Sequence, residues 1–357
     1  MNWKLIGLTG IILLIAAFWR LSSMLKITRE TYDTSPAIIS VLKTARPESY
    51  TTWHWERAAS STPWSPRDAH AWYVWDDTLW MLGGLNGNPI AQNDSVEYWN
   101  APHFAEIWKT KDGTTWSLVT ARGSWGPRRS MEIETFRDKL WMLGGWNKVH
   151  GYQDDIWYSN DGASWMRATS TRPFTPREGH GVAVMNNTLV LAGGVQFDDR
   201  STKNDVWLSS DGTTWKEALE HAPWSPRYDH TLTTFENKLW IIGGIDLKKD
   251  IKQDIWTSDD GISWKLLSDT PPWPARHGHS TFVFDNKLWI IGGWGKAGGL
   301  NDTWFTSDGI TWHALKTAAP WIGREDHTAT VFHDTIWMAG GMDNVWHWNN
   351  DLWHLVP

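Results

Sequence analysis

The hydrophobic and polar positions after residue 50 repeat with a long and regular period. Six Gly-Gly pairs mark this period, at residues 83–84, 144–145, 193–194, 243–244, 292–293 and 340–341. The first interval is the longest, and the later pairs recur at a near-constant spacing of about 50 residues. Such a period indicates an array of structural units, each of which buries its apolar face against the next.

Each unit contains four short segments in which apolar and polar residues alternate. This period of two predicts β-strands, and the Asp-Gly, Asp-Asp and Asn-Asn pairs between the segments predict tight hairpins. We name the strands a to d: strand a follows a Trp-x-Pro-Arg-x-x-His segment, b ends in Gly-Gly, c carries Asp-x-Trp, and d carries a further Trp. The sequence therefore predicts an all-β protein, a six-bladed β-propeller.

The last unit ends at Trp353 and the few residues after it, so it has no strand d of its own. Trp55 precedes Trp64 by the same interval that separates strand d from the following unit elsewhere in the chain, as from Trp215 to Trp224. We therefore expect Thr51–Arg57 to supply strand d of the sixth blade. Such a strand closes the ring and leaves no free sheet edge.

Tryptophan is unusually frequent, at 32 of 357 residues. Most of these residues fall on four repeat positions, and we expect their large flat side chains to pack between blades. Five others lie in the b–c connections: Trp99, Trp146, Trp294, Trp346 and Trp348. They either form a stacking platform for sugar rings or a partner's apolar side chains, or fold back onto the rim of the propeller.

In a four-stranded meander, the b–c and d–a connections of every blade lie at one end, which we call the loop face. The b–c connections vary in length, since the one between Gly84 and Trp108 is much longer than the one between Gly145 and Trp157. Variable loops on a rigid scaffold are the usual place for binding residues. We therefore expect a ligand to bind at the loop face.

The d–a connections also carry cationic residues: Arg67, Arg128, Arg177, Arg227, Arg276 and Arg324, with Arg129 beside the second. Guanidinium groups at the mouth of a channel are able to bind carboxylates in bidentate fashion. An arginine that recurs in every unit also fits a structural clamp between blades. The sequence leaves both interpretations open, and the regularly spaced histidines nearby have no metal-ligand spacing.

Blade 2 departs most from the repeat, because Met131 replaces the histidine and Glu132 and Glu134 lie on strand a. Two carboxylates on the same face of an innermost strand are costly unless they are paired. One interpretation is a pair of salt bridges to Arg128 and Arg129. The other is an acid/base pair or a cation site that faces the channel.

A hydrophobic segment lies near the N-terminus, between Lys4 and Arg20. Its length lies at the boundary between a signal-peptide core of about 7–15 residues and a membrane span of roughly 17–25. We expect a signal anchor or signal peptide within residues 1–30, a linker at 31–49 and the propeller at 50–357. The positive charges after the segment favour a cytoplasmic propeller, but a short tail with one Lys is typical of exported proteins. We expect a membrane-anchored or secreted, extracytoplasmic protein.

The charge and the cysteine content exclude several classes of site. The net charge is −7 and no long basic run is present, which argues against nucleic acid as a partner. The chain has no Cys, which excludes disulfides, thiolate metal sites, cysteine nucleophiles and a bacterial lipoprotein anchor. We expect no metal and no cofactor.

The Gly-Gly doublet, the aromatic residues that follow it and the Pro-Arg turn resemble the kelch-repeat superfamily, over about residues 50–357. Hairpins such as Ser209–Trp215 are similar to a shortened Asp-box, a structural hairpin of sialidases and secreted propellers. The resemblance implies a propeller whose relatives include adaptor domains, a copper oxidase acting on galactose and a periplasmic sialic-acid mutarotase. The oxidase requires a Cys that this chain lacks, and no mutarotase motif matches closely enough to transfer.

These observations favour a non-catalytic binding module, displayed outside the cytoplasmic membrane, that recognises a glycan or a protein through the loop face. One alternative is a carbohydrate-active enzyme, mutarotase-like, epimerase-like or hydrolytic, that uses Glu132, Glu134 and nearby arginines. Another is a structural assembly protein. The sequence does not identify the ligand or the oligomeric state.

Overall fold

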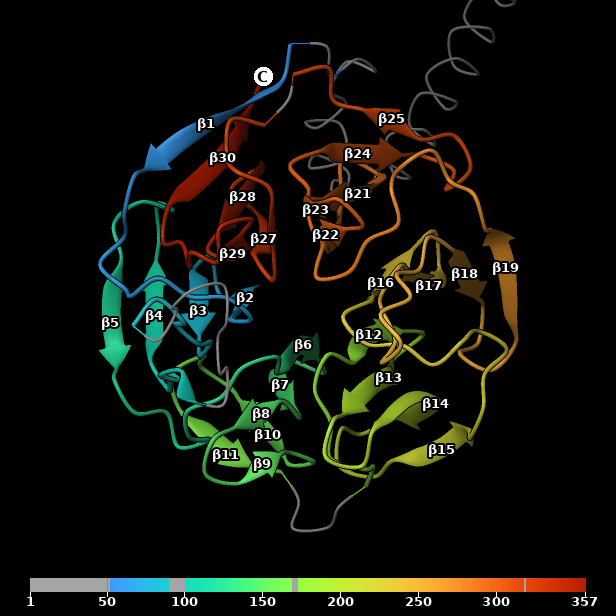
Figure 1. The fold of residues 1–357 in the computed structure, drawn as a ribbon. Helices are drawn as coiled ribbons and strands as arrows, with labels where there is room; N and C mark the ends of the chain where they lie inside the picture. The colour runs from blue at the N-terminus through green and yellow to red at the C-terminus, as the bar shows by residue number, and fades with distance from the viewer. Residues whose placement is uncertain (1–49, 51, 90–99, 169–172, 318) are drawn as a thin grey trace, which may run out of the picture. The chain divides into compact units, whose positions relative to one another are not determined.

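The computed structural model describes residues 50, 52–89, 100–168, 173–317 and 319–357. These residues form six four-stranded antiparallel sheets arranged as blades around a central channel (Figure 1). The prediction of an all-β six-bladed propeller is therefore confirmed. The hydrophobic signal anchor or signal peptide expected within residues 1–30 and the linker expected at 31–49 lie outside the described residues.

The first three blades follow the predicted order of strands a to d. Blade 1 consists of β2 (Ala71–Val74), β3 (Leu79–Leu82), β4 (Ile107–Thr110) and β5 (Ser117–Thr120). Blade 2 consists of β6 (Glu132–Phe136), β7 (Lys139–Leu143), β10 (Ile156–Ser159) and β11 (Trp165–Arg167). Blade 3 consists of β12 (Gly181–Met185), β13 (Thr188–Gln196), β14 (Ser201–Ser209) and β15 (Lys216–Leu219).

The other blades repeat this arrangement. Blade 4 consists of β16 (Thr231–Phe235), β17 (Lys238–Ile242), β18 (Ile255–Ser258) and β19 (Trp264–Ser268). Blade 5 consists of β20 (Ser280–Phe284), β21 (Lys287–Ile291), β24 (Thr303–Thr306) and β25 (His313–Ala314). Blade 6 consists of β27 (Thr328–Phe332), β28 (Thr335–Ala339), β30 (Leu352–Val356) and β1 (His54–Ala59).

Blade 6 is completed by the beginning of the described chain. β1 pairs antiparallel with β30, so that Trp55 lies opposite Leu355 and Arg57 opposite Trp353. The predicted closure is confirmed, although the strand spans His54–Ala59 rather than Thr51–Arg57. The difference arises because the backbone turns before the strand, where the amide of Trp53 donates to the carbonyl of Tyr50 at 3.3 Å.

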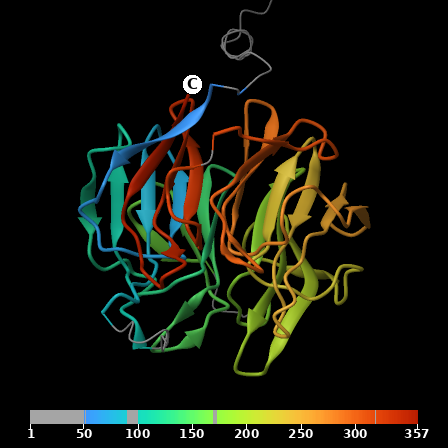
Figure 2. The same cartoon turned by 45° about the horizontal axis from the view of Figure 1, so that its top comes forward.

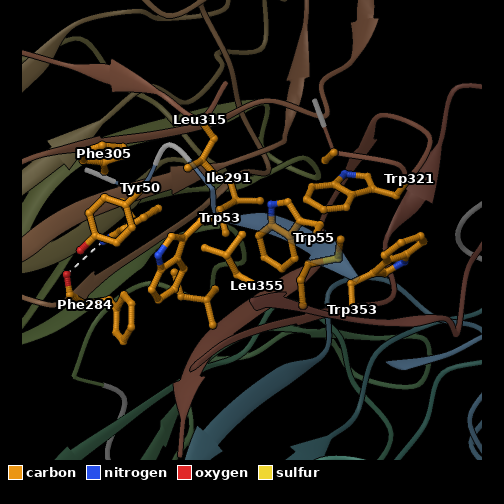
Figure 3. Packing of buried hydrophobic residues seen from close by; sticks show 14 residues of the cluster. Tyr50, Trp53, Trp55, Phe284, Ile291, Phe305, Leu315, Trp321, Trp353 and Leu355 are labelled. Atoms are coloured by element: carbon orange, nitrogen blue, oxygen red, sulfur yellow. Dashed lines mark hydrogen bonds between the residues drawn. The ribbon is translucent and has the colours of Figure 1, made fainter. Parts of the chain in front are cut away.

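That turn places two further aromatic rings in the core between blades 5 and 6. The Tyr50 ring meets Trp289 and Phe305 edge-on, at centroid distances of 4.9 and 4.8 Å. Trp53 and Trp55 are buried in the same cluster (Figure 3). The indole N–H of Trp55 also donates to Thr303. The closing segment therefore contributes three buried aromatic side chains as well as a strand.

The Trp of strand b packs against the next blade through a glycine of that blade's c–d hairpin. A Cβ on Gly212 would lie 2.3 Å from the Trp141 ring, and one on Gly309 would lie 2.1 Å from the Trp240 ring. These glycines also have positive φ, which accounts for the Asp-Gly turns. The predicted packing of the repeat-position Trp between blades is therefore seen directly, and Tyr50 makes this contact with Trp289 at blade 6.

The Gly-Gly doublets join neighbouring blades through the backbone. In each blade, the amide of the second glycine donates to the carbonyl of the repeat arginine in the next blade at 2.9–3.0 Å. The six bonds are Gly84 to Arg128, Gly145 to Arg177, Gly194 to Arg227, Gly244 to Arg276, Gly293 to Arg324 and Gly341 to Arg67. They complete a circle, so every blade is tied to both neighbours.

The side chain of the same arginine ties together the strands of its own blade. Arg227 is fully buried, and its Nη1 donates to the carbonyl of Gly243 at 2.9 Å and to Asp254 at 2.6 Å. Asp254 also accepts the indole N–H of Trp256. Equivalent contacts recur in every blade, with the carboxylates Glu106, Asp155, Asp205, Asp254, Asp302 and Asp351. The clamp lies within each blade and not between blades.

The closing segment predicts a sharp difference between two N-terminal truncations. A chain that begins at Ser60 lacks β1 and its three buried aromatic side chains, each of which contributes about 3–5 kcal/mol when fully buried. We expect this chain to lose most of its stability, whereas a chain that begins at Ala45 melts cooperatively. Differential scanning calorimetry provides the measurement. Equal melting temperatures would show that β1 contributes nothing to closure.

The clamp predicts that Arg227→Ala destabilises the propeller. Removal of one partner from a buried ion pair leaves the other charge uncompensated and costs about 3–5 kcal/mol. Chemical denaturation should therefore show a loss of this size, while the exposed Lys265→Ala on β19 should change the free energy of unfolding by less than about 0.5 kcal/mol. Similar unfolding curves for the two variants would contradict the clamp.

Candidate functional site at the loop face

Short additional strands extend the blades at the loop face. The pairs are β8 (Trp146–Asn147) with β9 (Gly151–Tyr152), β22 (Trp294–Gly295) with β23 (Gly298–Gly299), and β26 (Arg324–Glu325) with β29 (Met342–Asp343). In blade 3 the extension is continuous, and the β13–β14 hairpin, yellow-green in Figure 2, projects beyond the end of the blade. The described part of the loop face therefore contains short strand pairs as well as loops.

The loop tryptophans mostly turn inward. Trp146 is 5% exposed and lies under the guanidinium of Arg129, and Trp348 is fully buried. Trp294 and Trp346 are half-buried and pack against the cluster that contains Trp348. These positions support the interpretation in which the rings fold back onto the rim. The fifth residue, Trp99, lies outside the described residues.

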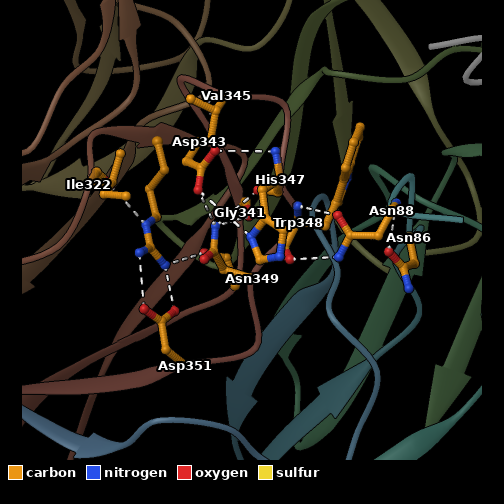
Figure 4. A network of polar contacts seen from close by, with 12 residues as sticks. Asn86, Asn88, Ile322, Gly341, Asp343, Val345, His347, Trp348, Asn349 and Asp351 are labelled. Carbon is orange, nitrogen blue, oxygen red and sulfur yellow. Dashed lines mark hydrogen bonds and ion pairs between the residues drawn. The ribbon is translucent and has the colours of Figure 1, made fainter. Parts of the chain in front are cut away.

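A polar network fixes the b–c loop of blade 6 against that of blade 1 (Figure 4). Asn88 accepts from the amide of Trp348 and donates to its carbonyl, at 2.8 and 2.9 Å. Asp343 accepts from the amides of Val345 and His347. This rigid loop leaves the Val345 side chain 72% exposed.

The side chains of the six repeat arginines are engaged in structural contacts within the blades. All six side chains are at most 2% exposed, and each is held by the carboxylate and the glycine carbonyl of its own blade. Arg129 is different, since its side chain is 12% exposed and makes a bidentate pair with Glu178 at 2.9 and 3.0 Å. The loop face therefore does not present a ring of free guanidinium groups.

Two residues separate the repeat arginine from the following histidine, and we call them the first and second turn positions. The second turn positions all have positive φ, between 47° and 62°. They are Ala69, Ser130, Gly179, Asp229, Gly278 and Asp326. Five backbone hydrogen bonds of 2.8–2.9 Å join neighbouring members of this set, each from the amide of one blade to the carbonyl of the preceding blade. They form a rigid annulus at the channel mouth on the loop face.

The turn positions are rich in carboxylates. The acidic members are Asp68, Glu178, Asp229, Glu325 and Asp326. Burial and the neighbouring carboxylates raise the pKa of Asp229 and of Glu325 well above the usual range, and burial raises the pKa of Asp326 to about 6. Burial lowers the pKa of His277 to about 4, so this histidine does not supply a positive charge at neutral pH.

The acidic mouth is a feature that the sequence pattern did not predict. The signal was present in the two variable positions of the Pro-Arg-x-x-His segment, where acidic residues occur five times in twelve positions. The recurring residues of that segment dominate the pattern, and the structure shows that they are structural. The residues at the second turn positions line the channel, together with the recurring histidines.

Glu132 and Glu134 line the channel below the mouth. The channel has a volume of about 520 Å³ and is lined by the innermost strands of the six blades. The expected salt bridges of Glu132 and Glu134 are not formed, because Arg128 pairs with Asp155 and Arg129 with Glu178. Burial raises the pKa of each carboxyl group to about 8, and the proximity of Glu134 contributes to the shift of Glu132.

The buried histidines act as packing groups between blades. A Cβ on Gly144 would lie 2.7 Å from Cε1 of His180, and one on Gly193 would lie 2.7 Å from Cε1 of His230. Met131 occupies the corresponding place against Gly83, which accounts for the substitution in blade 2. No group of His, Asp and Glu suited to hold a metal ion occurs among the described residues.

The channel carboxyl groups predict a specific pH dependence. Glu132 and Glu134 keep their protons in the folded state up to about pH 8, whereas the unfolded chain releases them near pH 4.5. The free energy of unfolding should therefore fall as the pH rises through this window. The double variant Glu132→Gln, Glu134→Gln should melt at a higher temperature than the parent at pH 8, with a smaller difference between pH 5 and pH 8.

The exposed Glu217→Gln on β15 is the control, because it changes the charge without touching the channel. Thermal melting followed by circular dichroism at a series of pH values gives the comparison. An unchanged pH profile in the double variant would show that the two carboxyl groups are ionised in the folded protein.

Comparison with known proteins agrees with the fold. Residues 179–357, half of the chain, match the family model of the KLHDC2/KLHL20/DRC7 Kelch-repeats domain. A search of curated proteins found no match. The described part of the chain contains no helix long and apolar enough to cross a membrane, and the hydrophobic segment near the N-terminus lies outside that part. On its repeats, its six blades and this match, the chain belongs to the Kelch-repeat family.

Proposed function

We propose that this protein is a non-catalytic binding module that recognises a protein partner through the loop face. Kelch propellers typically act as protein-interaction modules. The observation that carries the assignment to this face is the ordered b–c loop of blade 6, which holds an apolar side chain, Val345, 72% exposed on a rigid support. An exposed apolar side chain on preorganised backbone is a suitable anchor for a partner.

Other residues of the same face support this assignment. Ile322, in the d–a connection of blade 6, is 55% exposed, and Val149, in the b–c loop of blade 2, is 79% exposed. Trp294 and Trp346 are half-buried beside the blade 6 loop and offer part of their rings. Apolar and aromatic side chains at the centre of a polar rim are the usual composition of a protein interface.

The carbohydrate-active alternative receives less support from the structure. It required arginines beside Glu132 and Glu134, and the repeat arginines are buried in clamps. Two carboxyl groups that are mostly protonated at neutral pH remain in the channel, and the described residues that line it include no Lys or Arg to stabilise developing negative charge. We therefore favour binding over catalysis, with protein rather than glycan as the ligand.

We further propose that the propeller is displayed outside the cytoplasmic membrane. The support is the hydrophobic segment between Lys4 and Arg20, with the single Lys before it, together with the Asp-box-like hairpins. In these hairpins the aspartate accepts two backbone amides, as Asp211 does from Thr213 and Thr214 at 2.7 and 2.6 Å.

Because the chain has no Cys, a single introduced cysteine is the only thiol in the protein, and thiol-specific reagents are able to test both proposals. In the full-length chain, Val345→Cys places one thiol on the loop face, and Ile310→Cys places one on the opposite face in the c–d hairpin of blade 5. The two positions have nearly equal exposure, 72% and 71%. A photoactivatable cross-linker on Val345→Cys should capture a protein in the native host, and the same reagent on Ile310→Cys should not.

Labelling of intact cells with a membrane-impermeant maleimide tests the location with the same variants. Both cysteines should react before lysis if the propeller lies outside the membrane. Reaction only after lysis would contradict the proposed display. Capture from both faces alike, or only from Ile310→Cys, would contradict the assignment of binding to the loop face.

A further inference from the structure

The charged residue types that line the channel are acidic, and not basic as the repeat arginines suggested. The lining of the channel contains four carboxyl groups, Glu132, Glu134, Asp229 and Asp326, and the lining residues include no Lys or Arg. Asp229 and Asp326 belong to the annulus at the loop face, and Glu132 follows the mouth directly on β6. A group that enters from the loop face therefore meets carboxyl groups and no lining Lys or Arg along its path, and a positive charge there favours the ionised form of these carboxyl groups.

The mouth is also poor in internal counter-charge. Arg129 is engaged by Glu178 through two hydrogen bonds, and burial keeps His277 neutral although its Nδ1 lies 3.4 Å from Glu325. Asp68, Asp229 and Asp326 consequently share the field of Arg129, which Glu178 already engages. Without a further cation, such an arrangement favours the protonated form of these carboxyl groups, whereas a bound cation favours the ionised form.

Asp68 adds a further buried carboxyl group beside the mouth. Asp68 is 3% exposed, and its carboxylate accepts a hydrogen bond from the Trp348 side chain. Burial raises the pKa of this carboxyl group and Asp326 raises it further, while Arg129 and the hydrogen bond from Trp348 lower it. Asp68 therefore interacts electrostatically with Asp326 and Arg129 at the mouth.

The acidic side chains are held in fixed positions. Asp229 and Asp326 have φ values of 50° and 53° within the annulus, where their amides donate to Gly179 and Gly278. Their carboxylates lie over these same glycines, since a Cβ on Gly179 would be 2.5 Å from Asp229 and one on Gly278 would be 2.6 Å from Asp326. The glycines thus leave room for carboxylates that face the channel axis from two separate blades.

We propose that the mouth receives a positively charged side chain, Arg or Lys, from a protein partner, with Asp229 and Asp326 as its acceptors. This inference rests on the proposed function, because it names the chemistry by which the same face recognises its partner. A guanidinium or ammonium group carries several donors and is able to bridge carboxylates that project from different blades. The described residues hold no metal-ligand cluster that would compete for this place.

The test uses three fluorescent peptides of alternating Gly and Ser, capped at both ends, with two central residues that are both Arg, both Gln or both Glu. Fluorescence anisotropy at low ionic strength should give an affinity for the Arg peptide at least about tenfold above that for the Gln peptide, with the Glu peptide weakest. The Arg peptide should lose affinity as salt is added. Equal affinities for the Arg and Gln peptides would overturn the proposal.

The double variant Asp229→Asn, Asp326→Asn localises the effect. It should weaken binding of the Arg peptide by about tenfold or more. The matched control is Asp138→Asn, Glu236→Gln, which removes the same charge from exposed a–b turns at the opposite end of the propeller and should leave the affinity unchanged. An equal loss in both double variants would show that net charge, and not the mouth, attracts the peptide.

Thermal melting separates a binding role from a structural role. Asn tolerates the left-handed backbone of both positions, and neutral side chains relieve repulsion between carboxylates with raised pKa. The mouth variant should therefore melt at or above the parent temperature at pH 8 while it binds the Arg peptide less well. A lower melting temperature with unchanged peptide affinity would mean that the aspartates are structural.

The peptide test and the cross-linking test have independent outcomes, so they distinguish this inference from the proposed function. If Val345→Cys captures a protein but the peptides show no preference for Arg, the inference of a basic side chain is wrong and the proposed function stands. If the Arg peptide binds at the mouth but the loop-face cysteine captures nothing, the charge preference stands and the proposed protein-binding function does not.

Discussion

The arginine of the Pro-Arg turn is the residue on which the rest of the propeller depends. Its carbonyl accepts the amide of the second glycine from the preceding blade, so it joins neighbouring blades. Its guanidinium holds the first glycine's carbonyl and the strand-c carboxylate, as Arg227 does with Gly243 and Asp254, so it joins the strands of its own blade. Because one residue performs both tasks six times, the circle of blades and the interior of each blade are coupled.

This coupling explains why the recurring residues are poor candidates for recognition. A guanidinium that satisfies a buried carboxylate and a carbonyl cannot be withdrawn without leaving both acceptors unpaired in a dry environment. The glycines of the doublet are equally constrained, because a Cβ on Gly193 would collide with His230 of the next blade. Recognition is therefore left to the residues between the fixed ones and to the b–c loops.

The fold was predictable from the sequence because each motif, although weak by itself, recurs in six units. One Gly-Gly or one Asp-Gly turn carries little information, but six copies at a near-constant spacing fix the number of blades, and the recurring interval from Trp55 to Trp64 identifies the closing strand. The beginning of that strand was misplaced because the turn at Tyr50 and Trp53 depends on aromatic packing between blades 5 and 6, which a local pattern does not encode.

The site was much less predictable, for the same reason. Repetition draws attention to Arg227 or Trp240, whereas Asp229 and Asp326 occupy positions where neighbouring blades have Gly, Ala or Ser. The salt bridges of Glu132 and Glu134 with Arg128 and Arg129 were one interpretation, based on proximity in the chain. The structure instead pairs the two arginines with Asp155 and Glu178 of other segments. Pairing across strands and blades decides the charge of the channel, and one chain segment cannot reveal it.

Because recurring and variable residues have different roles, the polarity of the channel mouth is able to change while the contacts between blades stay the same. The six repeat arginines and their carboxylates neutralise one another inside the blades, so they contribute little net charge to the mouth. The polarity of the mouth is instead set by two exchangeable residues per blade, and the annulus fixes the backbone conformation of the second of them.

Small or acidic residues occupy the left-handed second turn position in every blade. The choice among them alters the field at the channel axis without altering any contact that holds the blades together. In this chain the choice is acidic in five of twelve positions and basic in one, Arg129, which Glu178 already engages. The stability of the propeller and the charge preference of its mouth are thus carried by different atoms of the same turn.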